Sequence, residues 1–534
     1  MSAPLDTDVL IVGSGVAGSL VGHRLASAGL RVTILEAGPR IDRADTVELY
    51  RESADRGNFM APYPGAAHAP QATLAGDYII QKGPYPYRTQ YVRGVGGTTW
   101  HWAAAAWRYL PVDFKLKSTH GVGRDWPISY DDLDPYYQQA EEALGVAGPD
   151  DEDLGSPRSA PYPMKALTLG YMDREFRKTL NANGFNVVTE PAARNSEDYG
   201  ERPQCCGSNN CMPICPIGAQ YSGDVHATKA EDAGATLIEN AVAFHVETDA
   251  DGKHATAVRY KRPDGSTARL TARFVVLAAN GIETPKLMLL STSDTLPQGL
   301  ANSSGMVGRN LMDHPGTTVT FLWGKPVFPG RGPQEMTSVV NFRDGPFRSE
   351  YAAKKLHLGN TADVSGVTES LLGKPLFGPA LDREIRQRVA RKVSIGCFHE
   401  QLPEPENRIV PSLAERDAIG IPRPEITYSI GEYIRRSAVE THKAYARIAA
   451  LLGAEEIEFD DEFAGNNHLM GTTIMGANRR DSVVDADCRT HDHPNLFIAG
   501  SSVFSSAAGV NSTLTIAALA IRLADTIAEE AAQP

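Results

Sequence analysis

The order of apolar and polar positions near the start of the chain predicts two strands with a helix between them. Residues 8–13 (DVLIVG) and 31–36 (RVTILE) are short apolar runs bounded by polar residues, the pattern of buried parallel strands. Between them, SLVGHRLASAG spaces its apolar residues as a helix does and ends at Gly29. The chain therefore begins with a predicted βαβ unit.

Two later segments repeat this combination. Residues 274–291 (FVVLAANGIETPKLMLLS) predict a buried strand, a turn and a helix that starts at Pro285. Residues 493–525 (HPNLFIAGSSVFSSAAGVNSTLTIAALAIRLAD) predict a strand, a loop of small residues and a long helix beginning near Ser512 or Thr513.

The turn after the first strand has the spacing of a dinucleotide site. Gly13 permits a tight turn, Gly15 lets the backbone approach a pyrophosphate, and Gly18 lets the helix lie close to the sheet. The helix N-terminus offers N–H groups to phosphates. Glu36, 23 residues after the first glycine, is placed to bind ribose hydroxyls. A purely structural turn is the alternative. Both FAD and NAD fit, and the N-terminal position followed by LEAGPR favours FAD.

Residues 93–109 (RGVGGTTWHWAAAAWRY) form a second glycine-rich segment. Its glycines allow another close approach of the backbone. Three aromatic side chains are candidates for the wall of a flavin site: Trp100, His101 and Trp102. The alternative is a glycine loop that leads into a buried aromatic helix.

Four of the six cysteines lie in the stretch 205–218, CCGSNNCMPICPIG. A disulfide is one interpretation, but the spacing is not that of a small stapled domain. Zinc is a second, although two well-separated CxxC pairs are missing. Four inert thiols are a third. The fourth is an iron–sulfur cluster, which the Cys215-Pro216 pair favours. Cys397 and Cys488 stand alone and are expected to be buried small residues.

Composition limits the class of protein. The chain has 534 residues, 42% apolar and 22% charged, which is typical of a globular protein of two domains or one large unit. Its net charge of -13 argues against nucleic-acid binding. No apolar run is long enough to span a bilayer. MSAPLDT leads directly into the first strand without a signal peptide, so the sequence by itself predicts a cytoplasmic location.

Together, these segments resemble the glucose–methanol–choline (GMC) oxidoreductase family. GSGVAGS, GVGGTTWHW, ANGIETPKLML and NLFIAGSS followed by NSTLTIAALA match its pattern in order. CCGSNNCMPICPIGA, MVGRNLMDHPG and NNHLMGTTIMG resemble the catalytic subunits of bacterial FAD-dependent glucose, gluconate and fructose dehydrogenases. The resemblance implies an α/β protein with the GMC/p-hydroxybenzoate-hydroxylase-like fold, in which a Rossmann-type FAD domain joins an α+β substrate domain with an antiparallel sheet.

The implied FAD domain is discontinuous, over 1–110, 220–320 and 465–534, and the substrate domain takes 110–195 and 320–465. The cysteine loop, 195–222, lies between them. RPEITYSI is an example of the alternating segments expected in the antiparallel sheet.

The resemblance also assigns residues. FAD contacts are expected from Gly13, Gly15, Gly18, Glu36, Gly96, Gly97, Thr98, His101, Trp102, Ala103, Gly500, Ser512 and Thr513. His468 in GNNHLMGTTIMG would be the catalytic base and Asn511 its partner, with Asn467 binding a further sugar hydroxyl. A three-iron (3Fe-4S) cluster would be held by Cys205, Cys211 and Cys215, leaving Cys206 as a non-ligand. His399 and Glu400 line the substrate pocket or form a buried pair, and the two interpretations are equally supported.

The expected activity is that of an FAD-dependent sugar dehydrogenase. A sugar hydroxyl, with glucose C1 favoured over gluconate C2 and fructose C5, would give hydride to flavin N5, and electrons would leave through the cluster. The resemblance implies a small subunit that carries the export signal, a multihaem cytochrome c subunit, and a position on the periplasmic face of the inner membrane. Other classes to exclude are an oxygen-using GMC oxidase and a non-redox flavin lyase. Covalent attachment of FAD through His101 is open, since Trp100 replaces the threonine of the related attachment loop.

Overall fold

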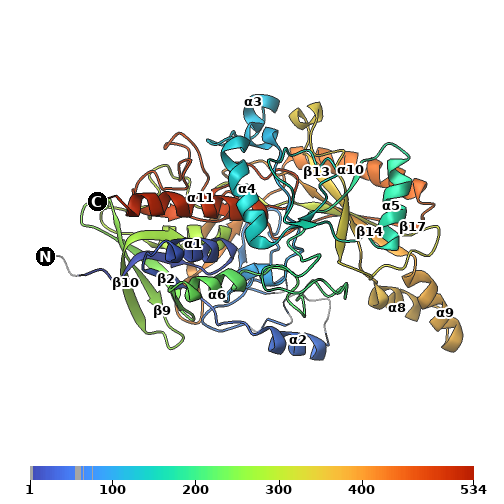
Figure 1. Ribbon diagram of the computed structural model, residues 1–534, viewed down its shortest axis with the longest axis horizontal. Coiled ribbons are helices and arrows are strands. Elements are labelled where there is room, and N and C mark those ends of the chain that lie inside the picture. Colours follow the sequence, from blue (N-terminus) through green and yellow to red (C-terminus); the bar gives the residue numbers. More distant parts are fainter. Residues whose placement is uncertain (1–3, 55–59, 61, 64, 75, 534) are drawn as a thin grey trace.

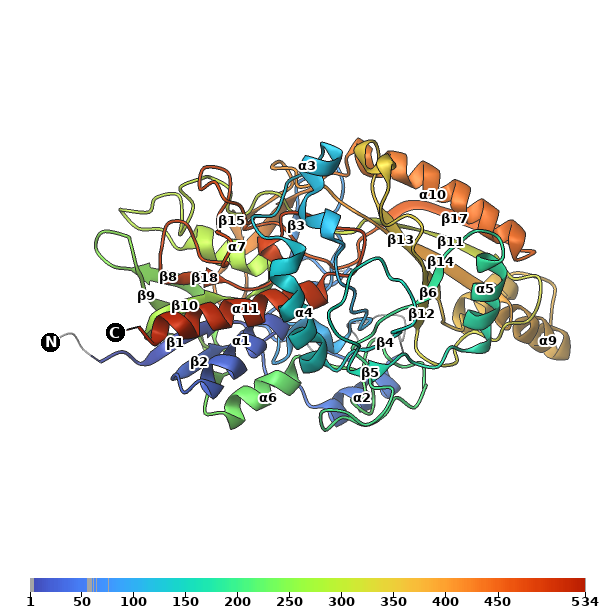
Figure 2. The same cartoon turned by 45° about the horizontal axis from the view of Figure 1, so that its top comes forward.

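The computed structural model describes residues 4–533 except 55–59, 61, 64 and 75. Two large β-sheets organise the chain, and they lie toward opposite ends of an elongated molecule (Figures 1 and 2). Helices α1, α6 and α11 lie beside the first sheet, and α5 and α10 beside the second (Figure 2). The site described below forms where residues from both parts meet.

The first sheet has a parallel core in the spatial order β7, β2, β1, β10, β18. The bounds of these strands are β1 Thr7–Val12, β2 Val32–Leu35, β7 Thr236–Ile238, β10 Thr267–Leu277 and β18 Leu496–Ile498. The first half of β10 pairs antiparallel with β9 (Ala255–Lys261), which pairs with β8 (Val242–Thr248). Strands from the N-terminus, the middle and the C-terminus thus share one sheet.

Helices pack closely around this sheet because the side chains on their contacting faces are apolar and small. The helices are α1 Val16–Ser27, α4 Tyr130–Leu144, α6 Asp224–Asp232, α7 Asn280–Leu290 and α11 Thr513–Ala531. Helix α1 contacts both α6 and α11, and α11 also contacts α4. The predicted βαβ unit and the C-terminal strand and helix are confirmed, although α1 begins three residues before the predicted segment.

The prediction that α7 starts at Pro285 is wrong, because the helix begins five residues earlier at Asn280. The Asn280 Oδ1 atom accepts hydrogen bonds from the N–H groups of Ile282 and Glu283 and so caps the helix start. Proline has no N–H to donate to the carbonyl of Gly281. The hydroxyl of Thr472 donates to that carbonyl instead, at 2.7 Å, which satisfies it.

The second sheet is antiparallel throughout, in the order β17, β11, β14, β13, β12, β6. The bounds are β6 Val187–Thr189, β11 Gly316–Leu322, β12 Glu335–Val339, β13 Lys354–Gly359, β14 Lys392–His399 and β17 Glu455–Ala464. One face packs apolar side chains against α5 (Tyr171–Asn181) and α10 (Glu432–Leu451). The antiparallel sheet expected from the sequence is confirmed.

RPEITYSI lies elsewhere: it contributes β16 (Pro422–Thr427) to a separate small sheet with β15 (Arg408–Arg416) and β3 (Ile80–Gln81). The remaining named elements are α2 Arg43–Glu52, α3 Leu116–His120, α8 Val364–Leu372, α9 Gly378–Val389, β4 Ala147–Gly148 and β5 Met164–Lys165. In the described part of the chain, no helix is both long and apolar enough to cross a bilayer.

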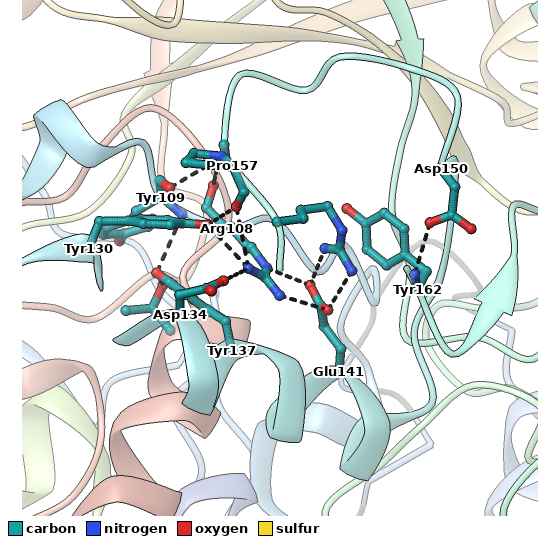
Figure 3. A network of polar contacts seen from close by, with 12 residues as sticks. Arg108, Tyr109, Tyr130, Asp134, Tyr137, Glu141, Asp150, Pro157 and Tyr162 are labelled. Atoms are coloured by element: carbon teal, nitrogen blue, oxygen red, sulfur yellow. Dashed lines mark hydrogen bonds and ion pairs between the residues drawn. The ribbon is translucent and has the colours of Figure 1, made fainter. Parts of the chain in front are cut away.

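A buried ionic network anchors the segment after the second glycine-rich loop (Figure 3). Arg108 donates to both carboxylate oxygens of Glu141 on α4, at 2.8 and 3.0 Å, and also binds Asp134. Arg158 binds the same Glu141 carboxylate at 2.6 and 2.8 Å and lies over the ring of Tyr162. Two arginines satisfy one fully buried carboxylate. The network therefore ties residues 105–110 to α4 and to the 150–163 loop.

Candidate active site

A cavity of about 1190 Å³ is lined by residues of the second sheet, by residues that directly follow strands of the first sheet, and by loops. Its wall includes the start of α1, residues 98–99 and 101–105, residues 465–469, residues 499–501 and the start of α11. Glu335 and Phe398 enter from the second sheet. A smaller cavity of about 120 Å³ shares Gly15 and Thr98 with the large one and extends toward Glu36. The volume is ample for a dinucleotide and a small substrate.

One wall of the large cavity consists of backbone and helix N-termini. A Cβ atom added at Gly15 or at Gly500 would meet nothing within 4 Å, so both positions border open space. The helices that begin at Val16 and Thr513 have no side-chain hydrogen bond at their N-caps, and both starts line the cavity. Unpaired N–H groups at two helix starts favour an anionic or strongly polar ligand.

Other predicted glycines serve the packing of this wall and do not line the large cavity. A Cβ at Gly18 would lie 1.9 Å from the carbonyl oxygen of Gly13, and one at Gly13 would lie 2.6 Å from the carbonyl oxygen of Ala278. A Cβ at Gly97 would lie 2.9 Å from the Cα of Gly15. The two glycine turns are therefore in direct contact, and larger residues would separate them. Gly96, with a φ of 97°, packs against Trp100 in the same region.

Glu36 borders the small cavity at the end of β2. One carboxylate oxygen accepts hydrogen bonds from the N–H and hydroxyl of Ser14, at 3.0 and 2.7 Å. The other accepts from the N–H of Gly38 at 3.1 Å. These contacts hold the carboxylate beside the first glycine turn, the position expected for a ribose ligand.

The aromatic residues of the second glycine-rich segment, 93–109, divide into two groups. His101, Trp102 and Ala103 line the large cavity, as does Thr98. Trp100 lies elsewhere, beneath the guanidinium of Arg43, so it does not form part of the wall. Residues 97–100 form a single 3-10 turn followed by extended chain, which excludes the alternative of a buried aromatic helix.

His101 is buried at the cavity, and neither ring nitrogen has a hydrogen-bond partner among the described residues. Burial lowers its pKa to about 4, so the imidazole is neutral at pH 7. A buried imidazole without partners is costly unless a ligand meets it.

A chain of hydrogen bonds fixes the protonation state of His468, which lines the cavity. The Nε2 atom of His314 lies 3.0 and 2.9 Å from the carbonyl oxygens of Ala507 and Ala508. Because carbonyls only accept, Nε2 of His314 carries the proton, and its Nδ1 is an acceptor when the ring is neutral. His468 Nδ1 lies 2.7 Å from that atom and must donate to it. Nε2 of His468 is then left as an unprotonated acceptor.

The burial of both rings supports this assignment of neutral tautomers to His314 and His468. It lowers the pKa of His314 to about 4, and it lowers the pKa of His468 well below the ordinary value, with His314 and Lys355 contributing further. Both rings are therefore neutral at pH 7. The Asp313 carboxylate accepts from the backbone N–H of His314 at 2.7 Å and of His468 at 3.0 Å, which holds the two segments together.

Asn511 lines the same cavity and is oriented by a buried ion pair. The ammonium group of Lys355 donates to Asn511 Oδ1 at 3.1 Å and to Glu190 Oε1 at 2.7 Å. Burial raises the pKa of Glu190, but the charge of Lys355 and the hydrogen bonds from Lys355 and Ser338 together outweigh burial and hold the pKa below its usual value. Because an ammonium only donates, the amide NH₂ of Asn511 remains as the donor available to the cavity.

The other predicted polar residues differ in their roles. Asn467 lines the cavity, but its Oδ1 accepts from the Thr89 hydroxyl at 3.0 Å and the Gln90 N–H at 2.7 Å, so only its NH₂ group is left for a ligand. His399 and Glu400 are fully buried and do not line the cavity. Of the two interpretations for that pair, the structure favours the buried one.

Another part of the cavity wall comes from the second sheet. Along β13, Lys355 and His357 point to the cavity side, while Leu356 and Leu358 lie in the apolar core under α5 and α10. Phe398 of β14 is paired with Lys355 in register and lines the cavity. Its ring packs against the rings of His357 and His468, with centroids 4.7 and 5.4 Å apart. The alternation of a strand thus separates the site from the core.

The predicted cluster ligands are free thiols: Cys211 and Cys215 are buried, Cys205 is half-buried and Cys206 is exposed. Burial raises the pKa of Cys205, and the neighbouring thiols Cys211 and Cys215 raise it further. Within the described residues, no three His, Cys, Asp or Glu side chains are grouped closely enough to hold a metal ion. A multi-iron cluster needs wider spacing, because each iron takes its own thiolate. Cys397 and Cys488 are buried, as expected.

The cysteine loop borders the large cavity. Met212, between Cys211 and Cys215, is one of the lining residues. The side-chain NH₂ of Gln220 donates to the backbone oxygens of Trp102 at 2.7 Å and of Cys211 at 3.3 Å. One amide therefore connects the cavity wall to the loop.

Sequence profiles of GMC oxidoreductases match residues 7–316 and 403–520. The chain belongs to the GMC oxidoreductase family. It is 49% identical over 539 residues to the fructose dehydrogenase large subunit of Gluconobacter japonicus, covering 99% of each chain. It is 24% identical to the gluconate 2-dehydrogenase flavoprotein of Pantoea cypripedii, covering 98% of this chain and 94% of that protein. A formate oxidase structure from Aspergillus oryzae has a TM-score of 0.68, with 16% identity and 99% coverage of both chains.

These similarities confirm the predicted fold class and identify an FAD-dependent oxidoreductase that acts on CH–OH donors. The site fits FAD, since positions 15 and 500 border open space and two helix N-termini face it. Sequence analysis missed several residues of the site, among them Glu190, His314, Lys355 and Glu335. Of these four, only His314 stood in a quoted motif, MVGRNLMDHPG.

Proposed function

We propose that this protein is an FAD-dependent sugar dehydrogenase in which His468 is the base that accepts the proton of the sugar hydroxyl. The observation that carries the proposal is the hydrogen-bond chain from the carbonyls of Ala507 and Ala508 through His314, which leaves Nε2 of His468 unprotonated beside the cavity. A base at that atom is what oxidation of an alcohol requires, because the hydroxyl must lose its proton as the carbon loses hydride.

Bound FAD supplies the acceptor for the hydride. The residues of the chain supply the rest: His468 takes the hydroxyl proton, and the amide NH₂ of Asn511 donates to the same oxygen and holds it in place. Lys355 adds a fixed positive charge behind Asn511, which favours the developing negative charge on that oxygen.

The preferred substrate is a hexose. The resemblance found in the sequence favours glucose, but the relative at 49% identity is named a fructose dehydrogenase. Fructose is therefore the first candidate, followed by glucose and then gluconate.

The cysteine loop is proposed to hold a 3Fe-4S cluster on Cys205, Cys211 and Cys215. Such a cluster accepts electrons singly and would allow them to leave toward a partner protein. Two observations support this placement: Met212 of the loop lines the large cavity, and Gln220 connects the loop to the cavity wall.

The proposed partners are a small subunit that carries an export signal and a multihaem cytochrome c subunit, and the proposed location is the periplasmic face of the inner membrane. The relative at 49% identity is named a large subunit, which supports an assembly of several chains.

The first experiment is an anaerobic visible spectrum of the purified protein during additions of fructose, glucose and gluconate in turn, with spin resonance of the same samples. Loss of flavin absorbance with one sugar, together with a cluster signal, is the expected result. Flavin that no sugar bleaches would contradict the sugar dehydrogenase, and rapid reoxidation in air would favour an oxidase instead.

Serine variants test the cluster assignment. Each of C205S, C211S and C215S is expected to lose the cluster signal, whereas C206S, the exposed neighbour, retains it. An unchanged signal in any of the three would overturn that ligand. Acid precipitation of the same protein tests attachment at His101: flavin that stays with the pellet in the native protein and is released from H101A supports a covalent bond.

A further inference from the structure

We propose that Glu335 anchors substrate hydroxyls in this cavity and makes the site selective for uncharged sugars over sugar acids. This inference deepens the proposed function and rests on it. Glu335 is the first residue of β12, and its side chain lines the large cavity.

The carboxylate of Glu335 lacks partners on the protein side. Its Oε2 atom is buried and has no hydrogen-bond partner among the described residues. Its Oε1 atom lies 4.0 Å from Nε2 of His357, too far for a hydrogen bond. A carboxylate with so few partners is unfavourable, and the Glu335 side chain is 15% exposed at the cavity, so a ligand that donates hydrogen bonds to it would be stabilised there.

His357 does not neutralise this carboxylate. Burial lowers the pKa of His357, and although Glu335 acts in the opposite direction, the shift remains downward. The ring is therefore neutral at pH 7. Gly396 provides room for the ring, since a Cβ at that position would lie 2.6 Å from its Nε2 atom.

The position of Glu335 relative to the base suits a hexose. Contacts run from Glu335 to His357, from His357 to the ring of Phe398, and from Phe398 to His468. Two rings therefore separate the carboxylate from the base. A hexose carries hydroxyls along its whole length, so one can meet His468 while others donate to Glu335.

The charge of the cavity wall supplies the selectivity. Among the described lining residues, Glu335 is the one carboxylate and none is a lysine or arginine. Lys355 is committed to Glu190 and Asn511 behind the wall. A sugar acid would bring a second negative charge near Glu335 in a medium of low dielectric, which is unfavourable. A neutral sugar meets no such cost and gains charge-assisted hydrogen bonds.

The test compares E335Q with E458Q, a control that removes a carboxylate from the exposed strand β17 of the same sheet. Two quantities are measured on flavin-loaded protein: the dissociation constant of an unreactive polyol by calorimetry, and the rate and half-saturation of flavin bleaching by fructose and by gluconate.

In E335Q, we expect the polyol and fructose to bind roughly ten- to a hundredfold more weakly, with a limiting bleaching rate within about threefold of the native rate, and gluconate to bind more tightly than in the native protein. E458Q should match the native protein. Equal polyol and gluconate binding in the two variants would overturn the role of Glu335. If the native protein is not bleached by sugars but E335Q still weakens polyol binding, the proposed oxidation fails while the anchoring role stands.

Discussion

The two walls of the large cavity are built by different means. The wall beside the first sheet is backbone: glycines at positions 13, 15, 18 and 97 bring two turns and a helix start into contact. The wall beside the second sheet is made of side chains, with Glu335 and Phe398 at the cavity and Lys355 and His357 beside Phe398. A backbone wall tolerates almost no substitution, whereas a side-chain wall keeps its strands while its chemistry changes. The difference suits a constant cofactor and a variable substrate.

The largest effect is expected from a substitution that adds a side chain to the backbone wall. Gly15 has an ordinary φ of -66° and a Cβ there meets no protein atom, so G15V should fold but place its side chain in the cofactor space. Flavin content should fall at least roughly tenfold, with the secondary structure preserved. The matched control is G373V, at an exposed position with a φ of -81° and open space. If G15V retains full flavin, the space does not belong to the cofactor.

The next largest effect is expected at His468, whose ring packs against Phe398 of the side-chain wall. H468Q removes the proposed base and should lower the limiting rate of flavin bleaching by about 10²- to 10⁴-fold, while flavin content stays unchanged. Anaerobic stopped-flow absorbance measures both. H254Q, at an exposed histidine, is the control. A rate that survives in H468Q would mean that another group takes the proton.

Lys355 contributes both to folding stability, through Glu190, and to the orientation of Asn511. K355M leaves Glu190 buried without its partner and should destabilise folding by about 3–5 kcal/mol. Activity should fall about ten- to a hundredfold. In the double variant K355M/E190Q most of the stability should return, because no buried charge is left unpaired, but the activity should not. Denaturant unfolding measures the stability of each variant and the flavin bleaching rate measures its activity, which together give a double-mutant cycle. Recovery of both stability and activity in the double variant would show that Lys355 acts only through folding.

A smaller effect is expected from His314, a positioning residue. H314F removes the acceptor for the Nδ1 proton of His468, so the tautomer with a protonated Nε2 becomes accessible and kcat/KM should fall about tenfold. H314Q offers an oxygen in its place and should recover part of the loss.

The pH profile separates this role from a merely structural one. Because burial lowers the pKa of His314 to about 4 and that of His468 well below its usual value, both rings stay neutral as the pH falls through 6.5. The kcat/KM of the native protein should therefore remain level there and decline only as the pH approaches the lowered values. A titration of His314 or His468 itself centred at pH 6.5 would contradict the lowered pKa values of these rings.

The contrast between the walls also explains what could be predicted from the sequence. Gly13, Gly15 and Glu36 lie within one βαβ unit, so their spacing alone predicts a site. Lys355 and Glu190 lie 165 positions apart and meet only through the pairing of β6, β12 and β13. Pro285 misled the prediction of α7 because the group that replaces its missing hydrogen bond, Thr472, is 191 positions from Gly281. Long-range pairs of this kind leave no local pattern.

The strict alternation along β13 bears on how relatives of this protein diverge. A substitution at position 357 alters the face that carries Phe398 and leaves the apolar core intact. Insertion or deletion of a single residue in that strand would exchange the two faces, turning leucines toward the cavity and a lysine and a histidine into the core. Changes of substrate within this lineage should therefore accumulate as replacements at alternate positions, while length variation is confined to the loops outside the strand.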